Sequence, residues 1–139
     1  MTDDHTVPQS LRIWFVVHFI ADMLFALPLL FLPRAFLGSL GWTTYDPLTA
    51  RLVGAALMGI GLESLLGRNA SAETFRAMLN LKIIWSSSAI FAISAALFEG
   101  APATGWVFLV IFVVFCVTWV TYRVRLGGGS SPREAEGWQ

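Results

Sequence analysis

The sequence predicts an all-α integral membrane protein, a four-helix bundle of antiparallel transmembrane spans with both the N- and C-termini in the cytoplasm. Four apolar runs are long enough to cross a bilayer. Hydrophobic residues make up 56% of the 139 residues, and the mean hydropathy is +0.69. Charged residues make up only 13%, against about 25% in ordinary soluble domains. A soluble domain of this size cannot bury so much apolar surface, so we expect lipid to surround most of the chain.

The lengths of the apolar runs agree with the thickness of a membrane. A helix rises about 1.5 Å per residue, so about 20 residues cross a hydrocarbon core of about 30 Å. One transmembrane bundle is therefore predicted over residues 13–125, with a cytoplasmic segment before it (1–12) and a polar Gly/Ser-rich tail after it (126–139). The predicted spans cover residues 13–32, 48–66, 79–98 and 105–122.

Residues between the runs indicate where helices begin. The first loop, 33–46, has a mixed composition typical of a short helix or turn at the membrane interface. Asp46 followed by Pro47 predicts the start of the second long helix, with aspartate as the N-cap and proline in the first turn. Ser71, with Glu73 two residues later, predicts the start of a third helix that begins ahead of its membrane-spanning part.

The distribution of basic residues predicts the orientation. With four spans, the N-terminal segment, the second loop and the C-terminal segment lie on one side of the membrane. That side carries seven of the nine Lys and Arg residues: Arg12, Arg68, Arg76, Lys82, Arg123, Arg125 and Arg133. Only Arg34 and Arg51 lie toward the other side. By the positive-inside rule, the side with the seven basic residues is cytoplasmic.

Polar residues within the spans form a candidate intramembrane site. His18 and Asp22 are four residues apart and lie on one face of the first span. By the rise per residue, Asp22 lies near mid-membrane, while Glu63 and Lys82 lie in the cytoplasmic half. Ser86 shares a face with Lys82. Charges inside a span cost about 3 kcal/mol each and tend to face the bundle and pair. We expect Glu63 to pair with Lys82 or His18, and Asp22 to bond to His18 or to a serine of the third span.

These residues allow both structural and functional interpretations. Glu63 and Lys82 suit a plain ion pair near the interface. His18 is either a core histidine held by Asp22, a proton relay, or the axial ligand of a porphyrin-type pigment. A pair of histidines on one haem is disfavoured, because the other histidine, His5, lies in the polar N-terminal segment.

Two spans carry candidate packing or partner faces. In the second span, Arg51, Ala55, Gly59 and Glu63 recur every four residues, which predicts a packed face with a charge at each end. Small residues there, Gly54 among them, let another helix approach closely. The fourth span carries an aromatic stripe, which favours core packing or lipid contact, or else docking of another membrane helix or of a lipid-like cofactor. Its members are Phe108, Phe112, Phe115 and Trp119.

Two stretches resemble a known class of proteins. One is FLP…LGW…DP…RLVGA, from Phe31 to Ala55, and the other is Lys-Ile-Ile-Trp, from Lys82 to Trp85. With the four spans, they make residues 11–125 similar to the small, largely uncharacterised four-span integral membrane proteins of bacteria. That resemblance implies the fold and a bacterial inner membrane, but no reaction. The chain is also similar to small multidrug transporters in carrying a carboxyl group in its first span, although its loops and the Glu63–Lys82 pair depart from them.

Several function classes lack support in the sequence. The formal net charge is zero, which gives no reason to expect a nucleic-acid partner. No phosphate-binding glycine loop, His-Glu metal helix or G-x-S-x-G elbow is present. Cys116 is the single cysteine, so a cysteine metal motif is excluded. We therefore predict no catalytic residues and no metal site.

Three functions remain at this stage. The preferred one is a non-catalytic accessory or scaffold subunit of a larger complex in the inner membrane, with the bilayer and other subunits or copies of itself as partners. The alternative is a small proton- or cation-coupled transporter that acts as a homo-oligomer through Asp22 and His18. The third is a binder or enzyme for an apolar ligand, which a pocket bounded by His18, Asp22 and Glu63 would support.

Overall fold

The structure is a computed structural model that describes residues 7–127, and this part of the chain contains helices and turns but no strand. The predicted N-terminal segment and the predicted Gly/Ser-rich tail lie largely outside the described residues. The helices are α1 (Gln9–Phe31), α2 (Pro33–Ser39), α3 (Pro47–Leu66), α4 (Ala72–Phe98) and α5 (Gly105–Gly127), with a short 3₁₀ turn at Gly67–Asn69.

Four of these helices are long and apolar enough to cross a membrane. They are α1, α3 with the 3₁₀ turn that follows it, α4 and α5. The predictions of an all-helical chain and of four candidate spans are therefore confirmed. The helices extend beyond the apolar runs, most of all α4, because polar residues can continue a helix into the interface.

The predicted helix starts are also confirmed. Asp46 caps α3, accepting hydrogen bonds from the backbone N and the side-chain Oγ1 of Thr49, both at 2.6 Å. These hydrogen bonds hold the pKa of the Asp46 carboxyl below its usual value. Ser71 caps α4 by accepting from the backbone N of Thr74, with Glu73 in the first turn. Between the first two long helices, α2 is the predicted short helix.

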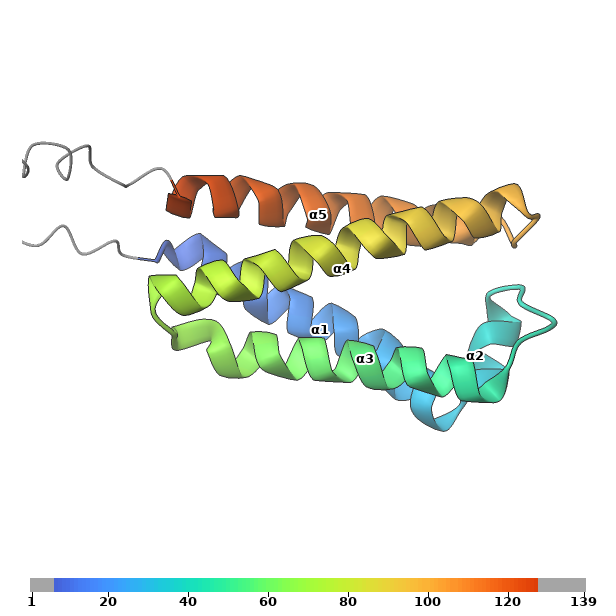
Figure 1. The fold of residues 1–139 in the computed structure, drawn as a ribbon. Helices are drawn as coiled ribbons and strands as arrows, with labels where there is room; N and C mark the ends of the chain where they lie inside the picture. Colours follow the sequence, from blue (N-terminus) through green and yellow to red (C-terminus); the bar gives the residue numbers. More distant parts are fainter. Residues whose placement is uncertain (1–6, 128–139) are drawn as a thin grey trace, which may run out of the picture.

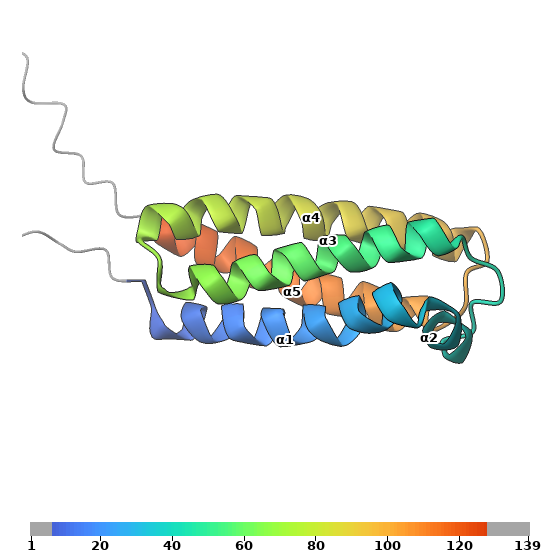
Figure 2. The ribbon, with the colours of Figure 1, turned by 90° about the horizontal axis from the view of Figure 1, so that it is seen from below.

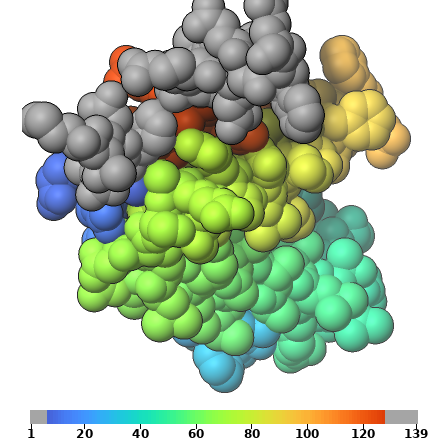
Figure 3. All heavy atoms as spheres, turned by 60° about the vertical axis from the view of Figure 1, so that its left-hand side comes forward, coloured from blue at the N-terminus to red at the C-terminus, as the bar shows by residue number. Residues whose placement is uncertain are grey.

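The long helices form two layers. One layer contains α1 and α3, which lie side by side in both Figure 1 and Figure 2, and the other contains α4 and α5. The layers meet at the end where the described chain begins and ends, and they separate toward α2 (Figure 1). Figure 3 shows the meeting end, with the first turns of α4 beside the start of α1 and the end of α5.

Large side chains join the layers at this end. Leu11 and Phe15 of α1 pack with Phe75 of α4 and Trp119 of α5, and all four are completely buried. In lipid, such contacts stabilise the bundle through van der Waals packing rather than through the removal of apolar surface from water. The buried members of a second cluster, Ala26, Leu29, Ala50 and Leu57, come from α1 and α3, and the partly buried Trp85 of α4 packs against them. Only one end of the molecule therefore has a cluster of buried hydrophobic residues from both layers.

The opposite end is bridged by loops. Thr104, before α5, donates its hydroxyl to the backbone oxygen of Leu40, after α2, at 2.6 Å. Beside it, Gly41 has a φ of +90°, and a Cβ there would meet the Pro102 ring at 3.3 Å. The glycine is required both for this left-handed conformation and for the close approach.

The predicted packed face of α3 is wrong within this chain. Ala55 and Gly59 are exposed, and a Cβ added at Gly59 would meet nothing within 4 Å. A step of four residues turns a helix by about 400°, so a stripe of such steps drifts away from the core. The face that packs alternates steps of four and three, and it includes the predicted Gly54: Ala50, Gly54, Leu57, Gly61 and Ser64 are buried.

We expect Gly61→Ala to destabilise the protein, while Gly59→Ala acts as its matched control. A Cβ at Gly61 would lie 2.8 Å from Cβ of Asp22, so α1 and α3 would have to move apart. Overpacking of this kind costs about 1–3 kcal/mol. Gly59→Ala should be neutral or slightly stabilising, because alanine favours a helix. Thermal unfolding in detergent measures both, and equal midpoints for the two variants would contradict the described packing.

Candidate functional site

Lys82 lies at the centre of the predicted polar site. Its side chain is fully buried on α4, and its Nζ donates to Ser64 Oγ at 2.6 Å and to Glu63 Oε2 at 3.4 Å. The ammonium group also lies 4.9 Å from the centre of the Phe15 ring and 5.7 Å from that of Trp119. The predicted pairing of Glu63 with Lys82 is confirmed. The amine points into the bundle rather than out to the interface.

Ser64 is the residue that the sequence reasoning missed. Its hydroxyl donates to the backbone oxygen of Ile60 at 2.8 Å, so its single hydrogen is already used. The same oxygen lies 3.2 Å from Nδ1 of His18 and accepts from Lys82. With the hydroxyl hydrogen directed at Ile60, this contact corresponds to the His18 tautomer that carries its hydrogen on Nδ1 and donates to Ser64. Ser64 carries no charge and drew no attention, although it falls on the same periodic face as Gly61.

Asp22 is left without a donor. Its Oδ2 lies 3.1 Å from Nδ1 of His18, so the predicted contact between these side chains is confirmed. The Nδ1 hydrogen is directed at Ser64, however, and Oδ2 of Asp22 is buried with no hydrogen-bond partner among the described residues. The alternative partner, a serine of the third span, is not used: Ser86 is buried nearby but makes no hydrogen bond to Asp22.

The aromatic stripe of α5 faces the interior of the bundle. Trp119 is fully buried, and its ring meets the His18 ring edge-on at 5.1 Å between centroids. Phe115 meets His18 in the same way at 4.8 Å and stacks on Trp119. Phe108 and Phe112 continue the stripe along a cavity. Among the interpretations left open by the sequence, these contacts favour core packing together with the lining of an internal site.

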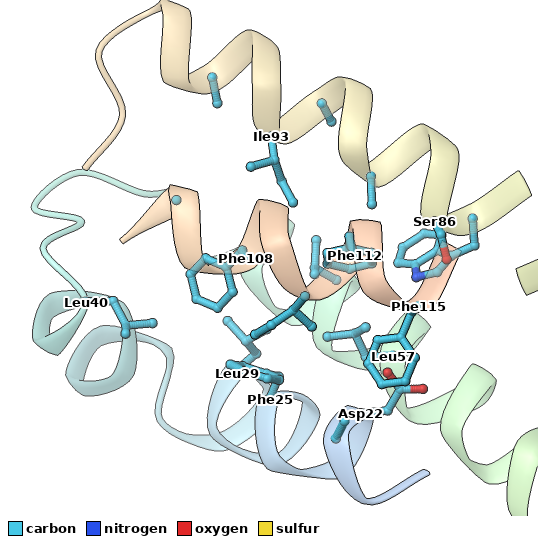
Figure 4. A pocket seen from close by; sticks show the side chains of 18 of the residues that line it. Asp22, Phe25, Leu29, Leu40, Leu57, Ser86, Ile93, Phe108, Phe112 and Phe115 are labelled. Atoms are coloured by element: carbon cyan, nitrogen blue, oxygen red, sulfur yellow. The ribbon is translucent and has the colours of Figure 1, made fainter. Parts of the chain in front are cut away.

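The cavity has a volume of about 530 Å³ and lies between the two layers. At one end it reaches Asp22 and Ser86, and at the other it reaches Leu40 (Figure 4). His18, next to Asp22, and Trp42 also line it. Its walls are otherwise almost entirely apolar, and they include Phe25, Leu29, Leu57, Trp85, Ile93 and Phe112. Of the predicted polar site, Glu63 and Lys82 do not line it.

Small residues on α4 explain why this space is open. Where the layers meet, α4 presents large side chains such as Phe75. Farther along, the side facing the cavity carries Ala89, Ala92 and Ala96, spaced three and four residues apart. At the separation of the two layers, these alanine side chains leave space unfilled, while Trp85 and Ile93 of the same helix contribute larger side chains to the wall. Part of the predicted polar site and three of the four residues of the predicted aromatic stripe thus line one cavity: His18, Asp22, Ser86, Phe108, Phe112 and Phe115.

The chemistry available in the cavity is limited to a few groups. Among residues 7–127, no three His, Cys, Asp or Glu side chains gather to hold a metal ion. The porphyrin-type pigment considered for His18 stays a prediction. Because Nδ1 of His18 contacts Ser64, His18 would have to bind such a pigment through Nε2. The chain matches no protein-family model, no curated protein and no solved structure.

We expect Ser64→Ala to lower the stability by about 1–3 kcal/mol, because it leaves buried donors of Lys82 and His18 without their shared acceptor. Ser87→Ala is the control, since Ser87 is exposed on the same α4 helix as Lys82 and makes only a long contact with Cys116. It should change stability by less than about 0.5 kcal/mol. Thermal unfolding in detergent again provides the measurement. A Ser64→Ala variant as stable as Ser87→Ala would refute the role of Ser64 as a shared acceptor.

Proposed function

We propose that this protein is a multi-pass membrane protein that binds an apolar ligand in the cavity between its two helix layers. The observation that carries this proposal is the cavity itself, about 530 Å³, with apolar walls and polar side chains at one end only. Ligand sites in proteins typically measure about 300–1,000 Å³ and combine apolar walls with a few oriented polar groups. A long apolar molecule with one polar end fits this distribution.

The surroundings of the chain favour the same conclusion. Water is a poor occupant of an apolar cavity, because each molecule there lacks hydrogen-bond partners. An empty space of this size would forfeit the dispersion contacts of its walls. In a membrane, apolar molecules surround the protein at high concentration. A lipid-like molecule is therefore the occupant that physical chemistry favours.

We further propose that the four long helices are antiparallel across a bacterial inner membrane, with both termini cytoplasmic, as in the small four-span bacterial proteins that the sequence resembles. The basic residues support this orientation, because they gather at one end of the bundle. There, Arg12 donates to the backbone oxygen of Arg68, and Arg76 donates to that of Leu126. The polar end of the cavity would then lie toward the cytoplasm.

Labelling of single cysteines tests this topology. In a Cys116→Ser background, Glu99→Cys and Asn69→Cys place exposed thiols at opposite ends of the bundle. We expect a membrane-impermeant maleimide to label Glu99→Cys in intact cells, and Asn69→Cys only after permeabilisation. The reverse pattern would show that the termini are on the outside, and equal labelling would exclude a four-span arrangement.

The other functions considered for this chain have weaker support. The scaffold hypothesis took the aromatic stripe of α5 as a docking face, whereas its members line the cavity or are buried. It stays a prediction, with the exposed small residues Ala55 and Gly59 as a possible contact for a partner. Transport through Asp22 and His18 also stays a prediction. Ser64 and His18 are hydrogen-bonded, but Ser64 does not line the cavity and its oxygen accepts from Lys82. This arrangement gives an enzymatic role no specific support.

Filling the cavity tests ligand binding. Ala89→Phe places a ring into the space between the layers, and we expect it to reduce the amount of co-purifying apolar ligand by about tenfold or more through steric exclusion. Ala55→Phe makes the same change on the exposed face of α3 and should leave the ligand in place. Mass spectrometry of extracts from protein isolated with its native lipids measures the ratio. Equal retention by the two variants would contradict binding in this cavity.

A further inference from the structure

The end of the cavity that contains Asp22 also indicates the chemical class of the ligand. We propose that the ligand is an amphiphile with a protonated amine at one end, and that this ammonium group pairs with the Asp22 carboxylate. The inference rests on the proposed function, because it assumes that the cavity is the binding site. It goes further in naming the head group and the side chain that recognises it.

The first argument is the balance of formal charge. The polar site contains two carboxyl groups, Glu63 and Asp22, and a single lysine, Lys82. Lys82 is 3.4 Å from Glu63 and donates to it, while no hydrogen bond joins Lys82 to Asp22. With His18 neutral and both carboxyl groups ionised, the site would carry one negative formal charge more than its cation balances. Without a further cation, a buried carboxyl is more stable in its protonated, neutral form. A buried charge in a membrane requires a partner, and the ligand can supply the positive charge.

The second argument is that each hydrogen-bond donor near Asp22 is directed at another acceptor or makes no hydrogen bond to Asp22. The Nδ1 hydrogen of His18 goes to Ser64, and the hydroxyl hydrogen of Ser64 goes to the backbone oxygen of Ile60. The indole N–H of Trp119 is buried without an acceptor, but no hydrogen bond joins it to Asp22 either. Asp22 Oδ2 therefore has no donor within the described chain. An unsatisfied buried acceptor is costly. Oδ2 itself has almost no accessible surface, so a ligand would pair with the carboxyl group through the part of Asp22 that lines the cavity.

The third argument is access. Asp22 lines the cavity, whereas Glu63 and Lys82 do not, so Asp22 is the ionisable carboxyl that a ligand in the cavity can reach. Figure 4 shows its carboxyl group at the same end of the cavity as Ser86 and Phe115. The position at the end of an apolar space explains why a head group, rather than the middle of a molecule, would occupy it.

The walls discriminate among head groups. Aromatic rings line the space next to Asp22 and beyond it, and their faces attract cations. A carboxylate head would be repelled by Asp22 and by the same ring faces. A neutral hydroxyl could donate one hydrogen bond but would leave the carboxylate charge unbalanced. An ammonium group donates hydrogen bonds to the carboxylate and also balances its charge. Hydrogen bonds between ions are roughly twice as strong as neutral ones.

Three probes test this inference: dodecylamine, dodecanol and dodecanoate. They share the same alkyl chain and differ only in their head group. Each is titrated against a neutral apolar fluorescent dye bound to the protein in phosphatidylcholine nanodiscs, with protein-free nanodiscs to subtract partitioning. We expect wild-type protein to bind dodecylamine about tenfold or more tightly than dodecanol, and dodecanoate most weakly. This comparison needs no variant, so it does not depend on the folding of a mutant.

Two matched variants locate the recognising group. Asp22→Asn keeps the shape of the side chain and removes its charge, so the preference for the amine should fall to within about twofold while dodecanol binding persists. Glu99→Gln removes a negative charge from an exposed site at the other end of the bundle and should retain the full preference.

The outcomes separate this inference from the proposed function. Equal affinity of wild-type protein for amine and alcohol, or an amine preference that survives Asp22→Asn, would overturn the head-group assignment and leave the cavity as a binding site. If the dye binds Ala89→Phe as well as wild type and no probe displaces it, the cavity is not the binding site, and both proposals fail.

Discussion

A fully buried lysine determines much of this structure. The ammonium group of Lys82 lies inside a bundle whose outer surface is apolar, so its charge must be stabilised by other parts of the protein. Ser64 and Glu63 of α3 accept its hydrogen bonds, and the rings of Phe15 on α1 and Trp119 on α5 lie around it. All four long helices therefore have to meet near Lys82. That requirement defines the end of the molecule where the two layers are joined.

The cavity follows from what happens away from that end. Large side chains fill the shared core around Lys82, but the side of α4 facing the cavity continues with alanines. The loops near Leu40 and Thr104 connect the layers again at the far end. Between these two points no buried core residue of α4 or α5 joins the cluster of α1 and α3, although the partly buried Trp85 packs against it, and Phe108, Phe112 and Phe115 of α5 line the space. Large side chains fill one end of the bundle, and small side chains leave space beside it. That space can hold a molecule as apolar as the surrounding lipid.

The two carboxyl groups have separate environments. Glu63 is about one-third exposed and serves as the counter-ion of Lys82. Asp22 is more deeply buried, next to His18, and its Oδ2 lacks a donor because Ser64 receives the histidine hydrogen. A single uncharged hydroxyl thus decides which carboxyl is satisfied within the protein and which remains for a ligand.

The sequence by itself determined the helical class, the four candidate spans and the helix starts at Asp46 and Ser71, because these depend on local composition and on neighbouring residues along the chain. It also limited the partner of Glu63 to Lys82 or His18, since charges in lipid have few partners, and the structure shows that the partner is Lys82. Only the tertiary structure decided which face of α3 packs, because the rotation of a helix depends on its neighbours and a step of four residues drifts. It alone showed that Ser64 links His18 to Lys82, and that most of the aromatic stripe and Asp22 share one cavity. Those relations join residues far apart in the chain, and the spacing along a single helix carries no information about them.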